Sequence, residues 1–179
     1  METDDIDAAR RGDRPAQGRL LRSLQDPWYR FCLSLLGGDA ERARDATQET
    51  ALRFLRQLPS FRGQSRLSTW SMGIAVNVVR EMRRAGGRTV SDDGRHADSR
   101  AAPGDAPGEA ASAGEQRDLI RSVLAGLPER QREVVALRYF EELSVEETAK
   151  AMDCAPGTVK ATLHQALRAI RRTIEQRHK

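Results

Sequence analysis

Apolar residues recur three and four positions apart along most of this chain, which is the spacing of one face of an α-helix. Residues 6–36 fit one or two such helices, with Asp26–Pro27 as a candidate break between them. Gly37–Gly38 then ends the pattern, and Asp39 is suited to cap a following helix over 40–58. The spacing therefore predicts an all-α protein.

The stretch from Leu143 to Arg172 predicts two short helices joined by a tight turn. Ser144 and Glu147 form the Ser-x-x-Glu capping box that starts a helix. Asp153 tolerates the left-handed backbone of a turn, and Pro156 suits the first position of the next helix. This pattern is typical of a helix-turn-helix, whose second helix enters the DNA major groove. An ordinary helical hairpin with a solvated basic face is the alternative.

The second of these helices has two distinct faces. One is an apolar stripe formed by Val159, Leu163, Ala166 and Ile170. The other is polar and basic, and its members include Ala161, His164, Gln165, Arg168 and Arg172. Upstream, apolar patterns predict a helix that ends near Leu127 and another that begins at Pro128.

The middle of the chain differs sharply in composition from the segments on either side of it. Residues 86–114 are rich in Gly, Ala, Ser, Asp and Pro, and Val90 is the one large apolar residue among them. Such a segment cannot bury enough surface to fold, so it predicts a flexible linker, and its acids outnumber its bases. The predicted architecture is two small helical domains, 1–85 and 115–179, joined by this linker.

Charge adds a hint about partners. Net charge is +4, and basic residues gather at the C-terminal end, where Glu175 is the one acid among five cations from Arg168 to Lys179. A basic helix end suits phosphate contacts, although cations also favour a solvated helix C-terminus. Aromatic residues make up only 4% of the chain, so its cores must be mainly aliphatic.

Several function classes lack support in the sequence. Cys32 and Cys154 lie far apart, which predicts reduced thiols in a cytoplasmic protein, and the scattered histidines predict no metal or cofactor site. Neither a signal peptide nor a membrane span is expected, because the N-terminus is acidic and the apolar run 72–79 is short. With no paired carboxylates or phosphate-binding loop, we expect no catalytic residues and no enzyme.

Two places on the N-terminal helices leave alternatives open. In the helix over 40–58, the polar side carries Asp45, Gln48, Glu49 and an outward Leu52, which suits either a protein-docking surface or a normal solvated face with one stray leucine. The next helix, over 69–84, is apolar almost all round except at Asn77. The residues alone favour an asparagine bonded within the core over one that faces a ligand.

These residues resemble the extracytoplasmic-function (ECF) sigma factors, the two-domain promoter-recognition subunits of bacterial RNA polymerase. In the first domain the resemblance rests on DATQETALRFLRQLPSFRG (45–63) and LSTWSMGIAVNVVREMRR (67–84). In the second it rests on LAGLPERQREVVALRYFEELSVEETAKAMDCAPGTVKATLHQALRAIRR (124–172). The order of the blocks and the linker between them also match, so the resemblance covers nearly the whole chain.

The resemblance implies partners and roles. It assigns 1–85 to sigma region 2, which docks on core RNA polymerase and melts the promoter's minus-ten element, and 115–179 to sigma region 4, which reads the minus-thirty-five element. An anti-sigma factor is a further candidate partner. The implied polymerase-binding residues are Asp45, Gln48, Glu49 and Leu52. The implied minus-ten residues are Phe61, Arg62, Arg66, Trp70, Asn77, Arg80, Arg83 and Arg84. The implied minus-thirty-five residues are Thr158, Lys160, Ala161, His164, Gln165, Arg168 and Arg172.

Under this resemblance Asn77 lines a pocket for a base extruded from the DNA stack, which reverses the preference for a core asparagine. Some positions depart from the family pattern. Ser68, Ser71 and Gly73 replace more typical Arg, Leu and Arg, and Gly73 in mid-helix costs roughly 1 kcal/mol against alanine. These departures bear on promoter sequence rather than on class.

The predicted function is a non-catalytic sigma factor that directs polymerase to promoters and helps to open them. A stand-alone helix-turn-helix regulator is the main alternative, although it leaves the Asp45–Leu52 face unused. A helical adaptor without DNA contact would leave the basic face of the last helix without a role. Because two weak DNA-binding modules act together on polymerase, we expect the free chain to bind promoter DNA poorly.

Overall fold

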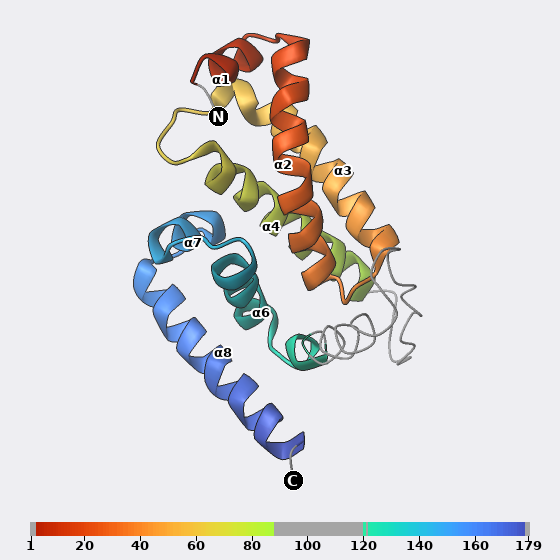
Figure 1. Cartoon of the computed structure of the whole chain (residues 1–179), viewed down its shortest axis with the longest axis vertical. Coiled ribbons are helices and arrows are strands. Elements are labelled where there is room, and N and C mark those ends of the chain that lie inside the picture. Colours follow the sequence, from red (N-terminus) through yellow and green to blue (C-terminus); the bar gives the residue numbers. More distant parts are fainter. Residues whose placement is uncertain (1–2, 88–119, 121, 178–179) are drawn as a thin grey trace, which may run out of the picture.

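The computed structural model describes residues 3–87, 120 and 122–177. Every regular element in that part of the chain is helical, as the apolar spacing predicts (Figure 1). Most of the predicted linker, 86–114, lies outside the described residues. The elements, in order, are α1 (Thr3–Arg10), α2 (Arg14–Leu35), α3 (Ala40–Gln57), the 3-10 turn η1 (Leu58–Ser60), α4 (Leu67–Gly87), α6 (Glu129–Val135), the π-helical turn η2 (Ala136–Phe140), α7 (Val145–Met152) and α8 (Pro156–Arg177).

Helices α1 to α4 form the N-terminal unit. Asp39 caps α3 as predicted, because its carboxylate accepts hydrogen bonds from the backbone N–H groups of Glu41 and Arg42. Asp26–Pro27 does not end a helix: α2 runs unbroken from Arg14 to Leu35. Leu24 and Trp28, on either side of the proline, are both buried in the core, so packing holds the helix through a residue that would break an isolated one.

Aromatic side chains link the N-terminal unit to the loop before α4. The ring of Phe54 lies 5.4 Å from that of Trp28 and 5.8 Å from that of Trp70. The ring of Phe61, in the loop, lies 5.0 Å from Trp70. The Trp28 indole N–H donates to Ser71 Oγ at 3.2 Å, which satisfies its polar group inside the core. The serine at this departure from the family pattern therefore has a structural role.

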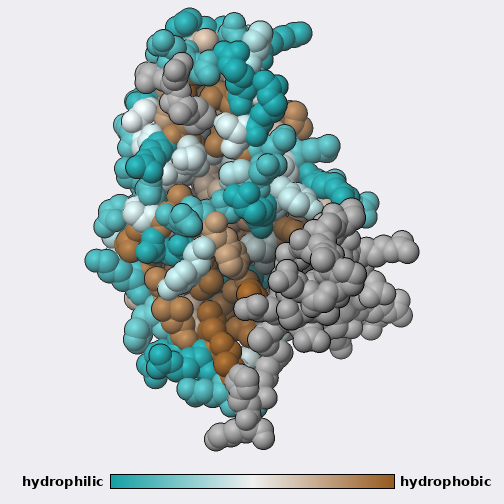
Figure 2. Space-filling view, viewed as in Figure 1, coloured by the Kyte–Doolittle hydropathy of each residue, from teal (hydrophilic) through white to brown (hydrophobic). Residues whose placement is uncertain are grey.

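Helices α6 to α8 form the C-terminal unit. The capping box is confirmed: Ser144 Oγ accepts from the Glu147 N–H at 3.1 Å, and Glu147 Oε2 accepts from the Ser144 N–H at 2.9 Å. Asp153 ends α7 in the left-handed conformation, with φ of 51°. Along α8, Val159 and Ala166 are fully buried, as the stripe predicts. Figure 2 shows hydrophobic residues gathered over the part of the molecule that includes α8.

The two units pack against each other, which the sequence did not predict. Helix α7 lies beside α4 (Figure 1), and turn η2 contacts α2. One continuous apolar core joins buried residues of α1–α4 with Val134, Leu137, Ala151, Met152 and Val159 of the C-terminal unit. The two units therefore share one apolar core among the described residues.

Candidate functional site

The outer side of α3 carries the residues that the resemblance assigns to polymerase binding. Asp45 and Gln48 are exposed, and the side chain of Leu52 is 50% exposed. Glu49 is half-buried and accepts a hydrogen bond from Arg53 Nε at 2.6 Å. Arg53 also pairs with Glu81 of α4 at 2.7 Å, and Glu81 and Glu49 together raise the pKa of this guanidinium. The pattern on α3 is thus an apolar side chain framed by polar and acidic groups on a rigid helix.

A cavity of about 580 Å³ opens between α4, the loop before it, and α7. Phe61 and Trp70 supply aromatic surface, and Asn77 and Arg62 supply polar groups. Its volume falls within the range of about 300 to 1,000 Å³ that is usual for small-ligand pockets. The cavity can therefore take a planar group that stacks on aromatic rings and hydrogen-bonds to polar side chains.

Asn77 is exposed and lines this cavity. The alternative of an asparagine bonded within the core is therefore wrong. Its neighbours Val76 and Val78 are fully buried, so Asn77 occupies the narrow face of α4 that does not pack on α2 and α3. Periodicity could not identify this face, because α4 is also covered by α7.

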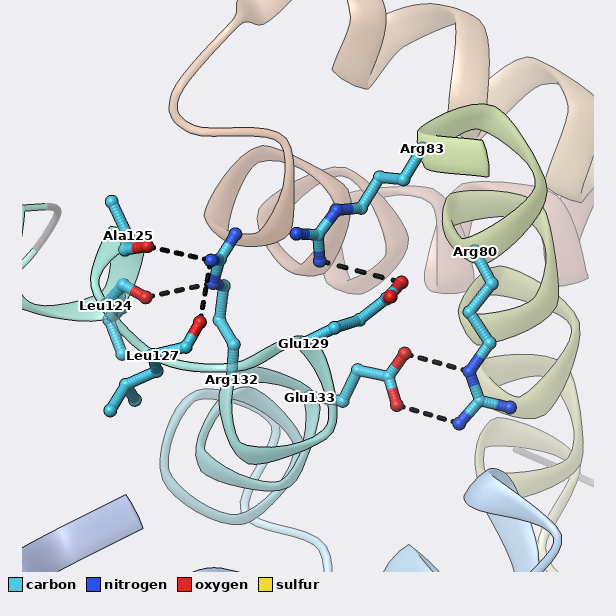
Figure 3. Close-up of polar contacts among 8 residues, drawn as sticks. All are labelled: Arg80, Arg83, Leu124, Ala125, Leu127, Glu129, Arg132 and Glu133. Carbon is cyan, nitrogen blue, oxygen red and sulfur yellow. Dashed lines mark hydrogen bonds and ion pairs between the residues drawn. The ribbon is translucent and has the colours of Figure 1, made fainter. Parts of the chain in front are cut away.

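The arginines at the C-terminal end of α4 differ in their surroundings. Arg84 is exposed, whereas Arg80 and Arg83 face acidic residues of α6 (Figure 3). Arg80 donates two hydrogen bonds to Glu133, at 2.8 and 2.7 Å, and the pairing raises the pKa of Arg80. Arg83 Nη1 lies 3.6 Å from Glu129 Oε1. Two of the three predicted phosphate-binding arginines are therefore paired within the chain.

The loop before α4 carries the other predicted minus-ten residues. Arg62 is exposed at the cavity rim, whereas Phe61 is buried, 7% exposed, against Trp70. Arg66 is 82% exposed, and its Nε lies 3.7 Å from Glu147 Oε1 in α7. The structure thus brings this loop and Asn77 to one cavity, while Arg80 and Arg83 lie further along α4.

The outer face of α8 is open. Each predicted minus-thirty-five residue is exposed there: Thr158, Lys160, Ala161, His164, Gln165, Arg168 and Arg172. The opposite face packs on α6 through Leu163, Ala166, Ala169 and Ile170. A rigid helix with one polar, cationic side turned to solvent can enter a DNA groove without rearrangement.

Four residues of the C-terminal unit make contacts with the N-terminal unit that the sequence did not predict. Glu129 and Glu133 approach α4, and Glu147 and Lys150 approach its N-terminal end and the preceding loop. Glu133 had one usable signal: it precedes the apolar pair Val134–Val135 on a core-facing helix, and a buried charge is almost always paired. Its partner, 53 positions away, had no signal in the sequence.

Other chemistry finds no support among the described residues. No group of three or more potential metal ligands occurs there, and none of these helices has the length and hydropathy to cross a membrane. Both cysteines are free thiols, as predicted. Burial raises the pKa of Cys32 to about 12, which keeps it protonated and unreactive.

Two family models match this chain. The model for sigma-70 region 2 matches residues 20–89, and the model for sigma-70 region 4 matches residues 117–170. The first match includes the α3 face and the α4 side of the cavity. The second includes the helix-turn-helix, whose α7 lines the other side of the cavity. A helix-turn-helix alone would not account for the first match.

Curated relatives agree along nearly the full length. The RNA polymerase sigma-H factor of Pseudomonas aeruginosa is 30% identical over 95% of this chain and 92% of that protein. The ECF RNA polymerase sigma factor ShbA of Streptomyces griseus is 31% identical over 92% of this chain and 91% of that protein. The sigma factor RpoE of Bartonella quintana, solved with the anti-sigma factor NepR, shares the fold with a TM-score of 0.68 at 21% identity, over 88% of this chain and 96% of that one. The chain belongs to the ECF family of RNA polymerase sigma factors.

Proposed function

We propose that this sigma factor acts as a non-catalytic subunit in the cytoplasm, where it binds core RNA polymerase, directs the enzyme to specific promoters and helps to melt them. Three surfaces of the chain would divide these tasks. The observation that carries the proposal is the cavity, which combines Asn77 and Trp70 of α4 with Phe61 of the preceding loop. Asn77 is the one exposed residue in the middle of α4, over 69–80.

The α3 face would hold polymerase. Leu52 is exposed beside Asp45, Gln48 and Glu49, so that an apolar anchor lies within a polar, acidic rim. Interfaces of this kind take most of their affinity from a few central side chains, while the rim sets orientation. The Arg53 ion pairs limit the rotamers of Glu49 and would prepare it for docking.

The cavity would receive a base from the nontemplate strand at the minus-ten element. Extruding a base costs a few kcal/mol, which the pocket must return. Stacking on an aromatic side chain supplies about 1–3 kcal/mol per base, and Trp70 is placed for it. Asn77 would then hydrogen-bond to the base edge, and Arg62, Arg66, Arg80, Arg83 and Arg84 would hold the backbone.

Helix α8 would read the minus-thirty-five element. Its exposed face offers Lys160, Arg168 and Arg172 to phosphates, and His164 and Gln165 to base edges. A stand-alone regulator that uses α8 alone is not favoured, because it would need neither the α3 face nor the cavity. The RpoE structure contains an anti-sigma factor, and we propose a regulator of that class as a further partner of this chain.

In vitro transcription with purified core polymerase on a genomic fragment library tests the proposal. Wild-type protein should direct initiation from a discrete set of start sites. Asp45→Ala with Leu52→Ala should abolish polymerase association, whereas Glu41→Ala, an exposed acid on the same helix, should leave it intact. A chain that binds no core enzyme, or that binds it without directing initiation, would exclude this function.

A further inference from the structure

A row of aromatic side chains leads from the centre of the N-terminal unit to the wall of the cavity. Trp28 on α2, Phe54 on α3 and Trp70 on α4 contact one another in that order, with ring centroids 5.4 and 5.8 Å apart. Phe61, in the loop before α4, lies 5.0 Å from Trp70. Trp70 and Phe61 line the cavity. Trp28 and Phe54 do not line it, so they can act on a ligand there only through Trp70.

Burial separates the inner part of this row from the outer part. Trp28 and Phe54 are 0% exposed, whereas Trp70 is half-buried in the first turn of α4. A partly exposed indole has access to several side-chain rotamers unless its neighbours exclude them. Phe54 is such a neighbour, because the close-packed core around it leaves its ring no room to move away. The inner side of Trp70 therefore rests on a rigid support.

The inclination of the rings leaves flat stacking on Trp70 to a ligand. The plane of Trp70 is inclined by 54° to that of Phe54 and by 43° to that of Phe61. Aromatic pairs favour tilted arrangements at centroid distances of about 4.5–7 Å, so both contacts are favourable. Neither ring is parallel to the indole, and so neither makes the flat contact that a base would make. The two contacts fix the plane of Trp70 without substituting for a base.

Ser71 holds the inner end of the row. The Trp28 indole N–H donates to Ser71 Oγ at 3.2 Å, and Ser71 Oγ donates to the carbonyl of Ser68 at 2.9 Å. Ser71 is fully buried, so the indole N–H would lose its acceptor if the Trp28 ring turned away. This serine, which departs from the family pattern, thus selects the orientation of Trp28 that packs on Phe54.

The orientation of Trp70 matters for binding as well as for stability. A side chain that is already held in place loses less conformational freedom when a ligand stacks on it. Extruding a base costs free energy that the pocket must return, so the pocket depends on contacts that need no further ordering. A substitution that releases Trp70 should therefore weaken base capture even where the fold survives.

We infer that Phe54, Trp28 and Ser71 are positioning residues, which hold the Trp70 ring in the plane on which an extruded nontemplate base stacks. None of the three lines the cavity. This inference rests on the proposed function, since it takes the cavity to be the site of that base. A structural role alone would make the effect of a substitution independent of the DNA. A positioning role makes the effect depend on whether the trapped base is present.

The test uses the full-length chain bound to core polymerase, on a promoter from which wild type initiates. Each nontemplate position of the minus-ten element is replaced in turn by an abasic site. Trp70→Ala identifies the trapped position, at which the abasic site abolishes the effect of the substitution, as in a double-mutant cycle. The half-life of open complexes after a heparin challenge measures base capture.

Phe54→Leu removes one ring of the row and keeps an apolar side chain. Phe31→Leu is the matched control, because Phe31 is equally buried in the same core and has no ring contact among the described residues. Phe54→Leu should shorten the half-life about fivefold on intact DNA, a loss in the range of one aromatic pair. On DNA with the abasic site it should have no more effect than Phe31→Leu.

Ser71→Ala tests the inner end of the row without removing a ring. Ser34→Ala is its control, because Ser34 Oγ donates to the carbonyl three residues before it, at 2.7 Å, as Ser71 Oγ does. Ser71→Ala should shorten the half-life about two- to threefold on intact DNA, since it leaves the Trp28 N–H without its acceptor. Neither serine variant should act on DNA with the abasic site.

The inference fails if Phe54→Leu acts equally on intact and abasic DNA, or acts no more strongly than Phe31→Leu. Where circular dichroism shows that Phe54→Leu is unfolded, Ser71→Ala against Ser34→Ala decides in the same way. If no abasic site abolishes the effect of Trp70→Ala, the cavity stacks no base and the inference falls, although a wild type that initiates remains a sigma factor. A wild type that never initiates with core polymerase would remove the proposed function itself.

Discussion

The two predicted DNA-binding surfaces of this protein are built in opposite ways. The surface on α8 is a solvent-facing row of polar and basic side chains, held from behind by apolar packing on α6. The surface on α4 combines a cavity with arginines that are already paired to α6. The α8 surface is open to solvent, whereas the α4 surface faces the C-terminal unit.

Under the proposed function, the two surfaces would bind different forms of DNA. A helix that reads duplex DNA meets base edges already displayed in the groove, so it needs only exposed side chains. A surface that traps an extruded base needs an aromatic side chain on which the base can stack. In this structure, acidic side chains of α6 already face two of the predicted minus-ten arginines of α4.

The largest effect is expected on the free energy of unfolding, if the two units share one core. Leu137 is fully buried in turn η2 and belongs to the core cluster that spans both units. Leu137→Ala should lower the free energy of unfolding by about 2–5 kcal/mol through lost burial and a cavity. Urea unfolding followed by circular dichroism gives this value. Leu167→Ala, at a side chain that is 41% exposed, is the control and should cost about 0.5 kcal/mol or less. Equal costs, or two separate unfolding transitions, would contradict a shared core.

Promoter melting and duplex binding should respond to substitutions on different helices. Asn77→Ala removes the polar group at the cavity and should reduce promoter opening by about tenfold, which corresponds to about 1.4 kcal/mol for one hydrogen bond to a base. Permanganate reactivity of minus-ten thymines in the polymerase complex measures opening. Gln165→Ala on α8 should instead weaken duplex binding and leave the opening of bound complexes unchanged. A loss of opening with Gln165→Ala and none with Asn77→Ala would reverse the assignment of the two surfaces.

A smaller effect should appear in the salt dependence of DNA binding by the free chain. Replacing a cation that contacts phosphate lowers the slope of log affinity against log salt by about 0.9. We expect this loss for Arg168→Gln, because Arg168 is exposed on α8, and less than half of it for Arg83→Gln, because Arg83 faces Glu129. Titrations at several salt concentrations measure the slopes, with Arg44→Gln on α3 as the control. An equal loss of slope for Arg168→Gln and Arg83→Gln would mean that α4 is already accessible to DNA in the free chain.

The smallest effect concerns pH. The Ser144 backbone N–H, together with the Ser144 and Thr69 hydroxyls and Arg66, lowers the pKa of Glu147 below its ordinary value. The stabilisation is therefore fully present above the ordinary carboxyl pKa and is lost as pH falls through the lowered one. Glu147→Gln should cost about 0.3–1 kcal/mol at pH 7, and the difference from wild type should shrink as pH falls below the ordinary carboxyl pKa. Urea midpoints at pH 7 and pH 3.5 give both values, and a difference that grows on acidification would contradict this sign.

The exposure of many candidate site residues could be predicted because it depends on short stretches of chain. Leu52 was recognised as an outward leucine, and its 50% exposure agrees. The helical period alone placed Ala161, His164, Gln165, Arg168 and Arg172 on an open face of α8, and their exposure agrees. Asn77 was different: its exposure depends on which side of α4 meets the other helices, and the residues alone favoured the wrong answer. Only the resemblance pointed to a pocket there.

What the sequence determined by itself is local. The capping box at Ser144 and Glu147, the left-handed turn at Asp153 and the apolar stripe of α8 each require contacts within a few residues, so their signals lie side by side in the chain. What only the tertiary structure decided is the closure of one unit on the other. The bond between Arg80 and Glu133, and the space that Gly73 leaves for Ala151, join residues more than 50 positions apart. Whether those residues meet depends on the packing of the whole core, and no short pattern in the sequence records it.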